Sequence, residues 1–120
     1  MKDKIITNNP LVQSKPPSGA ELIFVDGGLE DVLTRARDLV HQGHALLTHP
    51  LSGSVKPGET VYKTIIMSRG DALDTGSLEL IESAIAAAKK LRRGGRAFSD
   101  SILKDLQLVD YTLIFGKYNL

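Results

Sequence analysis

The sequence predicts an α/β fold: a three-layer sandwich in which a largely parallel, five-stranded sheet carries helices on both faces. Short apolar, β-branched runs alternate along the chain with segments whose apolar residues recur at helical spacing. Several strand-type runs are almost continuously apolar, which is typical of strands covered on both faces. The 120 residues fit a single domain, 1–120, with a topology like that of Rossmann folds.

Five segments have the composition of strands. The first is the short run 5–6, and the second is the apolar run 22–25. Three more follow in the middle and at the end of the chain, at 45–48, 61–67 and 109–115. If the first three are parallel and the first is central, their carboxyl ends form a crevice that favours a ligand.

Four segments have helical signals. Apolar residues at helical spacing predict a helix from Leu29 to near Gly43. Proline after an asparagine N-cap predicts a short helix over 10–15, and a second capped pattern with terminal cations covers 77–93. A fourth, short helix is predicted from residue 99 or 100 to 106.

Charge and cysteine content narrow the function classes. Fifteen Lys and Arg against fourteen Asp and Glu give a net charge of +1, so bulk electrostatics predict neither nucleic-acid nor membrane-surface binding. The chain has no Cys, which excludes disulfides, thiolate metal ligands and a cysteine nucleophile. No signal-peptide core or membrane-spanning run is present in the sequence, so a cytoplasmic location is expected.

Three polar stretches should meet at the carboxyl ends of the predicted strands. The first is Thr7, Asn8 and Asn9, at the start of a helix, where backbone N–H groups favour an anion. Plain N-capping is the alternative interpretation. The second is 26–28, an Asp followed by two glycines, which is interpreted as a turn. No G-x-G-x-x-G follows the first strand, so no dinucleotide, and no other cofactor, is predicted.

The third stretch lies in the long connection 46–63. Ser52, Gly53, Ser54 and Lys56 place small residues, hydroxyls and one cation within five positions, a composition suited to an anionic group. The spacing is not that of a P-loop. Prolines in the same segment are equally typical of a stiff surface connection, although a loop of about a dozen residues favours a function.

The three histidines do not form a recognised metal site. His41 and His44 would lie at a helix end, where they suit the negative end of the helix dipole, whereas His49 follows a strand. No metal site and no catalytic residue are therefore predicted. A nucleophilic triad is not supported either, because His49 and the nearby serines lack the G-x-S-x-G elbow.

Several stretches carry a resemblance to a known family. They are Thr7-Asn8-Asn9-Pro10-Leu11-Val12, Arg37-Asp38-Leu39-Val40-His41-Gln42-Gly43-His44, Leu47-Thr48-His49-Pro50-Leu51-Ser52-Gly53-Ser54-Val55-Lys56-Pro57 and Thr60-Val61-Tyr62-Lys63. Together they resemble the GrdX family, over residues 5 to about 90. The resemblance implies a small accessory protein of the glycine, sarcosine and betaine reductase systems of anaerobic bacteria. It implies no activity, and a chain without Cys cannot itself perform the thiol chemistry of those reductases.

Three hypotheses of function follow. In the first, a non-catalytic protein binds a small anionic metabolite in the crevice. In the second, the protein docks on a reductase subunit or on itself. In the third, and least supported, it is a small enzyme with His49 as base. The ligand-binding residues of the first hypothesis are Thr7, Asn8, Asn9, Thr48, His49, Ser52, Gly53, Ser54 and Lys56.

Overall fold

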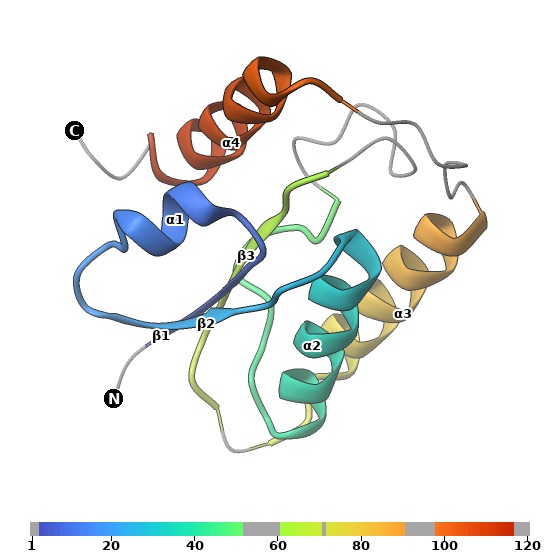
Figure 1. The fold of residues 1–120 in the computed structure, drawn as a ribbon. Coiled ribbons are helices and arrows are strands. Elements are labelled where there is room, and N and C mark those ends of the chain that lie inside the picture. The colour runs from blue at the N-terminus through green and yellow to red at the C-terminus, as the bar shows by residue number, and fades with distance from the viewer. Residues whose placement is uncertain (1–2, 52–60, 71, 91–97, 117–120) are drawn as a thin grey trace.

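The protein is a small α/β domain with a three-stranded mixed sheet and four helices (Figure 1). The computed structural model describes residues 3–51, 61–70, 72–90 and 98–116. Strand β1 (Asp3–Thr7) is central, between β2 (Ala20–Phe24) and β3 (Thr64–Met67). β1 pairs with β2 in parallel and with β3 antiparallel. The end of β1 therefore lies beside the end of β2 and the beginning of β3.

One face of the sheet is covered by α2 (Leu29–His41) and α3 (Thr75–Lys90). Their apolar stripes pack on alternate strand residues, with Ile6 of β1 and Ile65 and Met67 of β3 in the same buried cluster. The helix predicted from Leu29 is confirmed. The helix predicted around 77–93 is confirmed as far as Lys90 and begins two residues earlier, and residues 91–93 lie outside the described residues. Gly43, at φ 101°, provides the left-handed conformation that ends the α2 segment.

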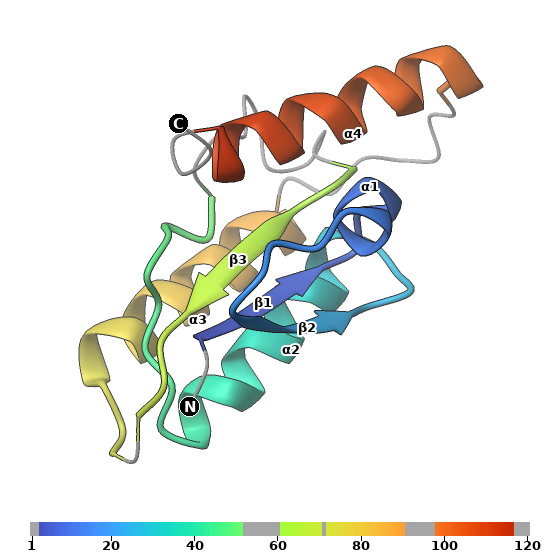
Figure 2. The ribbon, with the colours of Figure 1, turned by 90° about the vertical axis from the view of Figure 1, so that its left-hand side faces the viewer.

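The opposite face of the sheet is covered by α1 (Pro10–Ser14) and α4 (Asp100–Phe115). Here Ile5 of β1 packs with Val12 of α1 and with Ile114 and Phe115 at the end of α4. Figure 2 shows α1 and α4 together on one side of the strands, with α2 and α3 on the other. The short helix predicted after Asn9 is confirmed, since Asn9 Oδ1 accepts from the Leu11 N–H.

The predicted five-stranded, largely parallel sheet is wrong, and one reason is the segment 45–48. This segment runs antiparallel to β3 but forms only a single bridge, between Leu46 and Met67. Backbone bonds still join it to β3: the Leu47 and Thr48 N–H groups donate to the Ile66 carbonyl oxygen, and the Ser68 N–H donates to the Ala45 carbonyl oxygen. Hydroxyl groups take two further backbone donors, since the Ile66 N–H donates to Thr48 Oγ1 and the Leu46 N–H donates to Ser77 Oγ. Apolar composition predicted a strand here, but side-chain bonds interrupt the regular ladder.

The second error concerns the end of the chain, where a short helix and a strand at 109–115 were predicted. Residues 100–115 form the single helix α4, capped by Ser99. The buried positions Asp110, Ile114 and Phe115 recur at helical spacing and pack on the sheet, so tertiary packing overrides the β-propensity of the run. With these two strands absent and β3 antiparallel, the crevice expected between parallel neighbours does not form as predicted.

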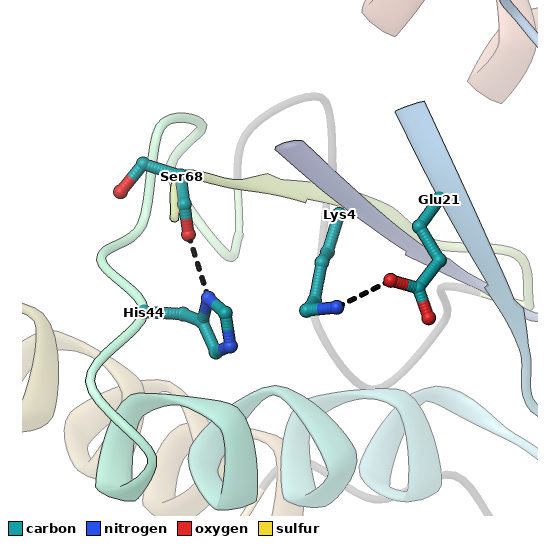
Figure 3. A network of polar contacts seen from close by, with 4 residues as sticks. All are labelled: Lys4, Glu21, His44 and Ser68. Atoms are coloured by element: carbon teal, nitrogen blue, oxygen red, sulfur yellow. Dashed lines mark hydrogen bonds and ion pairs between the residues drawn. The ribbon is translucent and has the colours of Figure 1, made fainter. Parts of the chain in front are cut away.

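The end of the sheet where β1 begins is fastened by two polar contacts (Figure 3). Lys4 forms an ion pair with Glu21, its register partner on β2. His44 Nδ1 lies 2.9 Å from the carbonyl oxygen of Ser68, which follows β3. Because Glu21 is half-exposed, the ion pair contributes at most about 1 kcal/mol. No helix in the described part of the chain is long and apolar enough to cross a membrane.

Candidate functional site

The candidate site lies at the edge of the sheet where β1 and β2 end and β3 begins. Thr7, the last residue of β1, pairs with both Phe24 and Thr64, so these three positions lie side by side at this edge. The chain leaves β1 into α1 and leaves β2 towards α2. Residues 61–63, which directly precede β3, lie at the same edge. Segments that border all three strands therefore converge here.

Asn8 holds three of these segments together. Its side-chain Nδ2 donates to the carbonyl oxygens of Gly27 and Val61, each at 2.9 Å. Its Oδ1 accepts from the Lys63 N–H at 2.8 Å. The amide of Asn8 thus fixes the turn after β2 and the residues before β3 relative to β1. Both of its N–H groups and its oxygen are used within the protein.

Asn9 links the start of α1 to α4. Its Oδ1 caps α1, while its Nδ2 donates to the carbonyl oxygen of Gln107 at 2.9 Å and to Asp110 Oδ2 at 3.0 Å. The same Asp110 oxygen accepts from Thr64 Oγ1 at 2.6 Å, and Thr64 Oγ1 lies 2.7 Å from Thr7 Oγ1. Asp110 is therefore the centre of a buried polar network that connects α4 to the sheet.

Lys63 is the buried cation of this edge. It directly precedes β3 and is only 2% exposed. Burial lowers the pKa of Lys63 from 10.5 to about 8, and the carboxylate of Asp110 opposes this shift only in part. The ammonium form still predominates at neutral pH, so the edge carries a positive charge in a largely water-free environment. Burial of a charged group costs free energy, which hydrogen bonds and an opposite charge offset.

The two sides of this edge differ in charge. On the side of α2, Asp26, Glu30 and Asp31 surround the start of the helix, and Asp31 Oδ2 accepts from the Gly28 N–H. These carboxylates disfavour an anion at the N-terminus of α2. The second polar stretch, 26–28, therefore belongs to the capping of α2.

The remaining predicted ligand residues divide into two groups. Thr48 and His49 are described, and both make local contacts: Thr48 Oγ1 accepts from Ile66, and His49 Nδ1 accepts from the Leu51 N–H at 3.0 Å. The others lie outside the residues that the structure describes. They are Ser52, Gly53, Ser54 and Lys56.

The three histidines do not come together. His41 is exposed at the end of α2, His44 contacts Ser68, and His49 contacts Leu51. Among the described residues, no group of three or more His, Asp or Glu side chains is arranged to hold a metal ion.

Sequence reasoning missed Lys63 and Asp110, the two charged residues of the network. Each stands as a charged residue inside an otherwise apolar, β-branched run, at 61–67 and 109–115. A charge at such a position is the signal that was available, because runs of this kind are usually buried. The sequence could not show that Lys63 and Asp110 lie near each other, because they are 47 positions apart.

The fold and this edge define a small α/β protein whose strand ends enclose a buried cation and a buried carboxylate. The model of the family described as GrdX-like protein matches residues 4–118, nearly the whole chain. The chain therefore belongs to the GrdX-like family, and the resemblance found in the sequence is confirmed. Neither a curated protein nor a solved structure matches the chain significantly.

Proposed function

We propose that this GrdX-like protein is a non-catalytic accessory protein that binds a small anionic metabolite at the edge around Lys63. The observation that carries the proposal is the buried ammonium group itself, 2% exposed and with a pKa lowered to about 8. A buried ammonium group of this kind can hold an anion by a charge-assisted hydrogen bond. The resemblance to proteins of the glycine reductase systems supports an accessory role in a cytoplasmic, anaerobic setting.

The energetics of Lys63 favour a binding role over a structural one. Burial lowers the pKa of Lys63 from 10.5 to about 8, which corresponds to roughly 3 kcal/mol of destabilisation of the charged form. An apolar side chain of similar length would avoid this cost. Residues that weaken the fold in this way are typically found where a function requires them.

The other predicted residues have distinct parts in the proposed site. Thr7, Asn8 and Asn9 hold the edge in shape, because their side chains bond to the turn after β2, to Lys63 and to α4. Ser52, Gly53, Ser54 and Lys56 belong to the segment that reaches Lys63 along the chain, and we propose that they supply further contacts to the anion. Thr48 and His49 precede this segment and anchor its start beside β3.

The proposal is tested by isothermal titration calorimetry and thermal shift with inorganic phosphate, acetate, glycine, betaine and nucleotides. An anion at 100 times its dissociation constant contributes about 2.7 kcal/mol and raises the melting temperature on the order of ten degrees. Lys63→Met should abolish binding of that anion. Lys56→Ala should weaken binding of the anion if the connection before β3 takes part in the site.

Two controls separate a binding defect from a folding defect. Lys104→Met removes an exposed cation on α4 and should leave the affinity unchanged. For the wild-type protein, affinity should fall up to about tenfold per pH unit above pH 8, because an anion binds the protonated ammonium. Equal binding by the wild type and Lys63→Met, or no binding of any compound tested, would refute the proposal.

A further inference from the structure

The outer side of α4 carries an apolar stripe that the fold does not bury. Among the described residues, most of the large apolar side chains with high exposure belong to this helix. Ile102, Val109 and Leu113 are 45%, 52% and 48% exposed, and Leu106 between them is half-buried. Leu108, 57% exposed, lies on the same helix about 100° away from Val109 and outside the stripe. Val109 and Leu113 each directly precede a buried residue, so the stripe is turned by about 100° from the face that packs on the sheet.

The spacing of the stripe is that of a helix-pairing seam. Ile102, Leu106, Val109 and Leu113 are separated by four, three and four residues, the repeat that brings side chains of two helices into register. The spacing is the same in both directions along the helix. An antiparallel copy of the same helix therefore presents the same pattern in return.

We propose that α4 pairs antiparallel with α4 of a second copy of this chain, about a two-fold axis near the middle of the helix. In this arrangement Ile102 faces Leu113 of the second copy, and Leu106 faces Val109. Each of the four layers then combines one leucine with one β-branched side chain. A two-fold interface needs this kind of self-complementarity, whereas a different partner protein would not require it.

Charge is consistent with a second copy, whereas the size of the helix limits how tightly two copies can pair. No charged residue lies within the stripe, and on one flank Asp105 lies opposite Thr112 of the second copy, so like charges do not face each other there. Helix dipoles that run antiparallel attract one another. The 16-residue helix offers a footprint of only about 24 Å by 10 Å, far below the ~800 Å² per partner of a standard interface. The dimer should therefore be weak and depend on concentration.

Sedimentation equilibrium between about 5 and 500 µM tests the pairing. The wild type should shift from monomer to dimer over this range, and Val109→Glu should weaken dimerisation at least tenfold. Leu73→Glu is the matched control, because Leu73 is equally exposed but lies outside α4, and it should dimerise like the wild type. A wild type that stays monomeric, or a Val109→Glu variant that dimerises normally, would overturn the proposal.

The register is tested by cysteine cross-linking, which is unambiguous because the natural chain has no Cys. Ile102→Cys mixed with Leu113→Cys should yield a disulfide-linked pair on mild oxidation, and each variant alone should yield far less. Both positions are about half exposed, so the substitutions should leave the fold intact, as far-UV circular dichroism can verify. Equal cross-linking in the mixture and in the single variants would contradict the antiparallel register.

Discussion

Asp110→Ala is expected to destabilise the protein by about 3–5 kcal/mol, the range observed when one partner of a buried charged network is removed. Asp110 is 9% exposed, and its Oδ2 accepts hydrogen bonds from Thr64 and Asn9. The alanine leaves those two donors without this acceptor and removes the carboxylate that supports the charge of Lys63. Urea unfolding should be followed by far-UV circular dichroism, because the chain has no Trp.

Asp105→Ala is the matched control for this substitution. Asp105 lies on the same helix but is exposed, so its removal should change the free energy of unfolding by no more than about 0.5 kcal/mol. Asp110→Asn keeps the shape of the side chain, so its loss in free energy of unfolding should lie between those of Asp110→Ala and Asp105→Ala. If Asp110→Ala unfolded at the same urea concentration as Asp105→Ala, the network around Asp110 would not hold α4 on the sheet.

Lys63→Met is expected to stabilise the protein, by up to about 3 kcal/mol near pH 7, because the burial of the Lys63 charge costs more than its attraction to Asp110 returns. The folded-state pKa of Lys63, about 8, lies below its ordinary value of 10.5. The unfolded chain therefore binds more protons between these two values, and Lys63 makes the wild type more stable as pH rises through this window. The advantage of methionine should be full below about pH 8 and should fade as pH approaches 10.5.

Urea unfolding of both proteins at intervals from about pH 6 to 10 measures this difference. Lys104→Met provides the comparison, because its side chain is exposed on α4 and its replacement should give no such pH-dependent gain. A Lys63→Met protein that is less stable than the wild type at neutral pH would show that the ammonium group supports the fold. Its burial would then be no argument for binding.

Individual helices could be predicted from sequence where the spacing of apolar residues or an N-cap residue marks them. The stripe that begins at Leu29 and the cap at Asn9 each predicted a helix that the structure contains. The sheet could not be predicted, because the run 109–115 has β-propensity but satisfies its packing as a helix. Segment 45–48 was predicted as a strand and does bond to β3, but sequence does not show that side chains of Thr48 and Ser77 interrupt a regular ladder.

The structure brings together some of the predicted site residues, but whether they bind a ligand stays a prediction. Asn8 and Asn9 lie at the edge where several segments meet. Their amide groups, however, bond to distant backbone at Val61 and Gln107, and such partners cannot be inferred from spacing along the chain. For the same reason the proximity of Lys63 and Asp110 could be found only in the tertiary structure.

The most direct test of the proposed anion site is the pKa of Lys63, followed by NMR in protein labelled with ¹³C-lysine. The chain has nine lysines, and the resonance missing from Lys63→Met identifies the one of interest. We expect this resonance to titrate near pH 8 without ligand and at a higher pH when phosphate, or another anion that binds, is present at saturation. A Lys63 that titrates near 10.5, or one whose pKa no anion changes, would contradict the proposal.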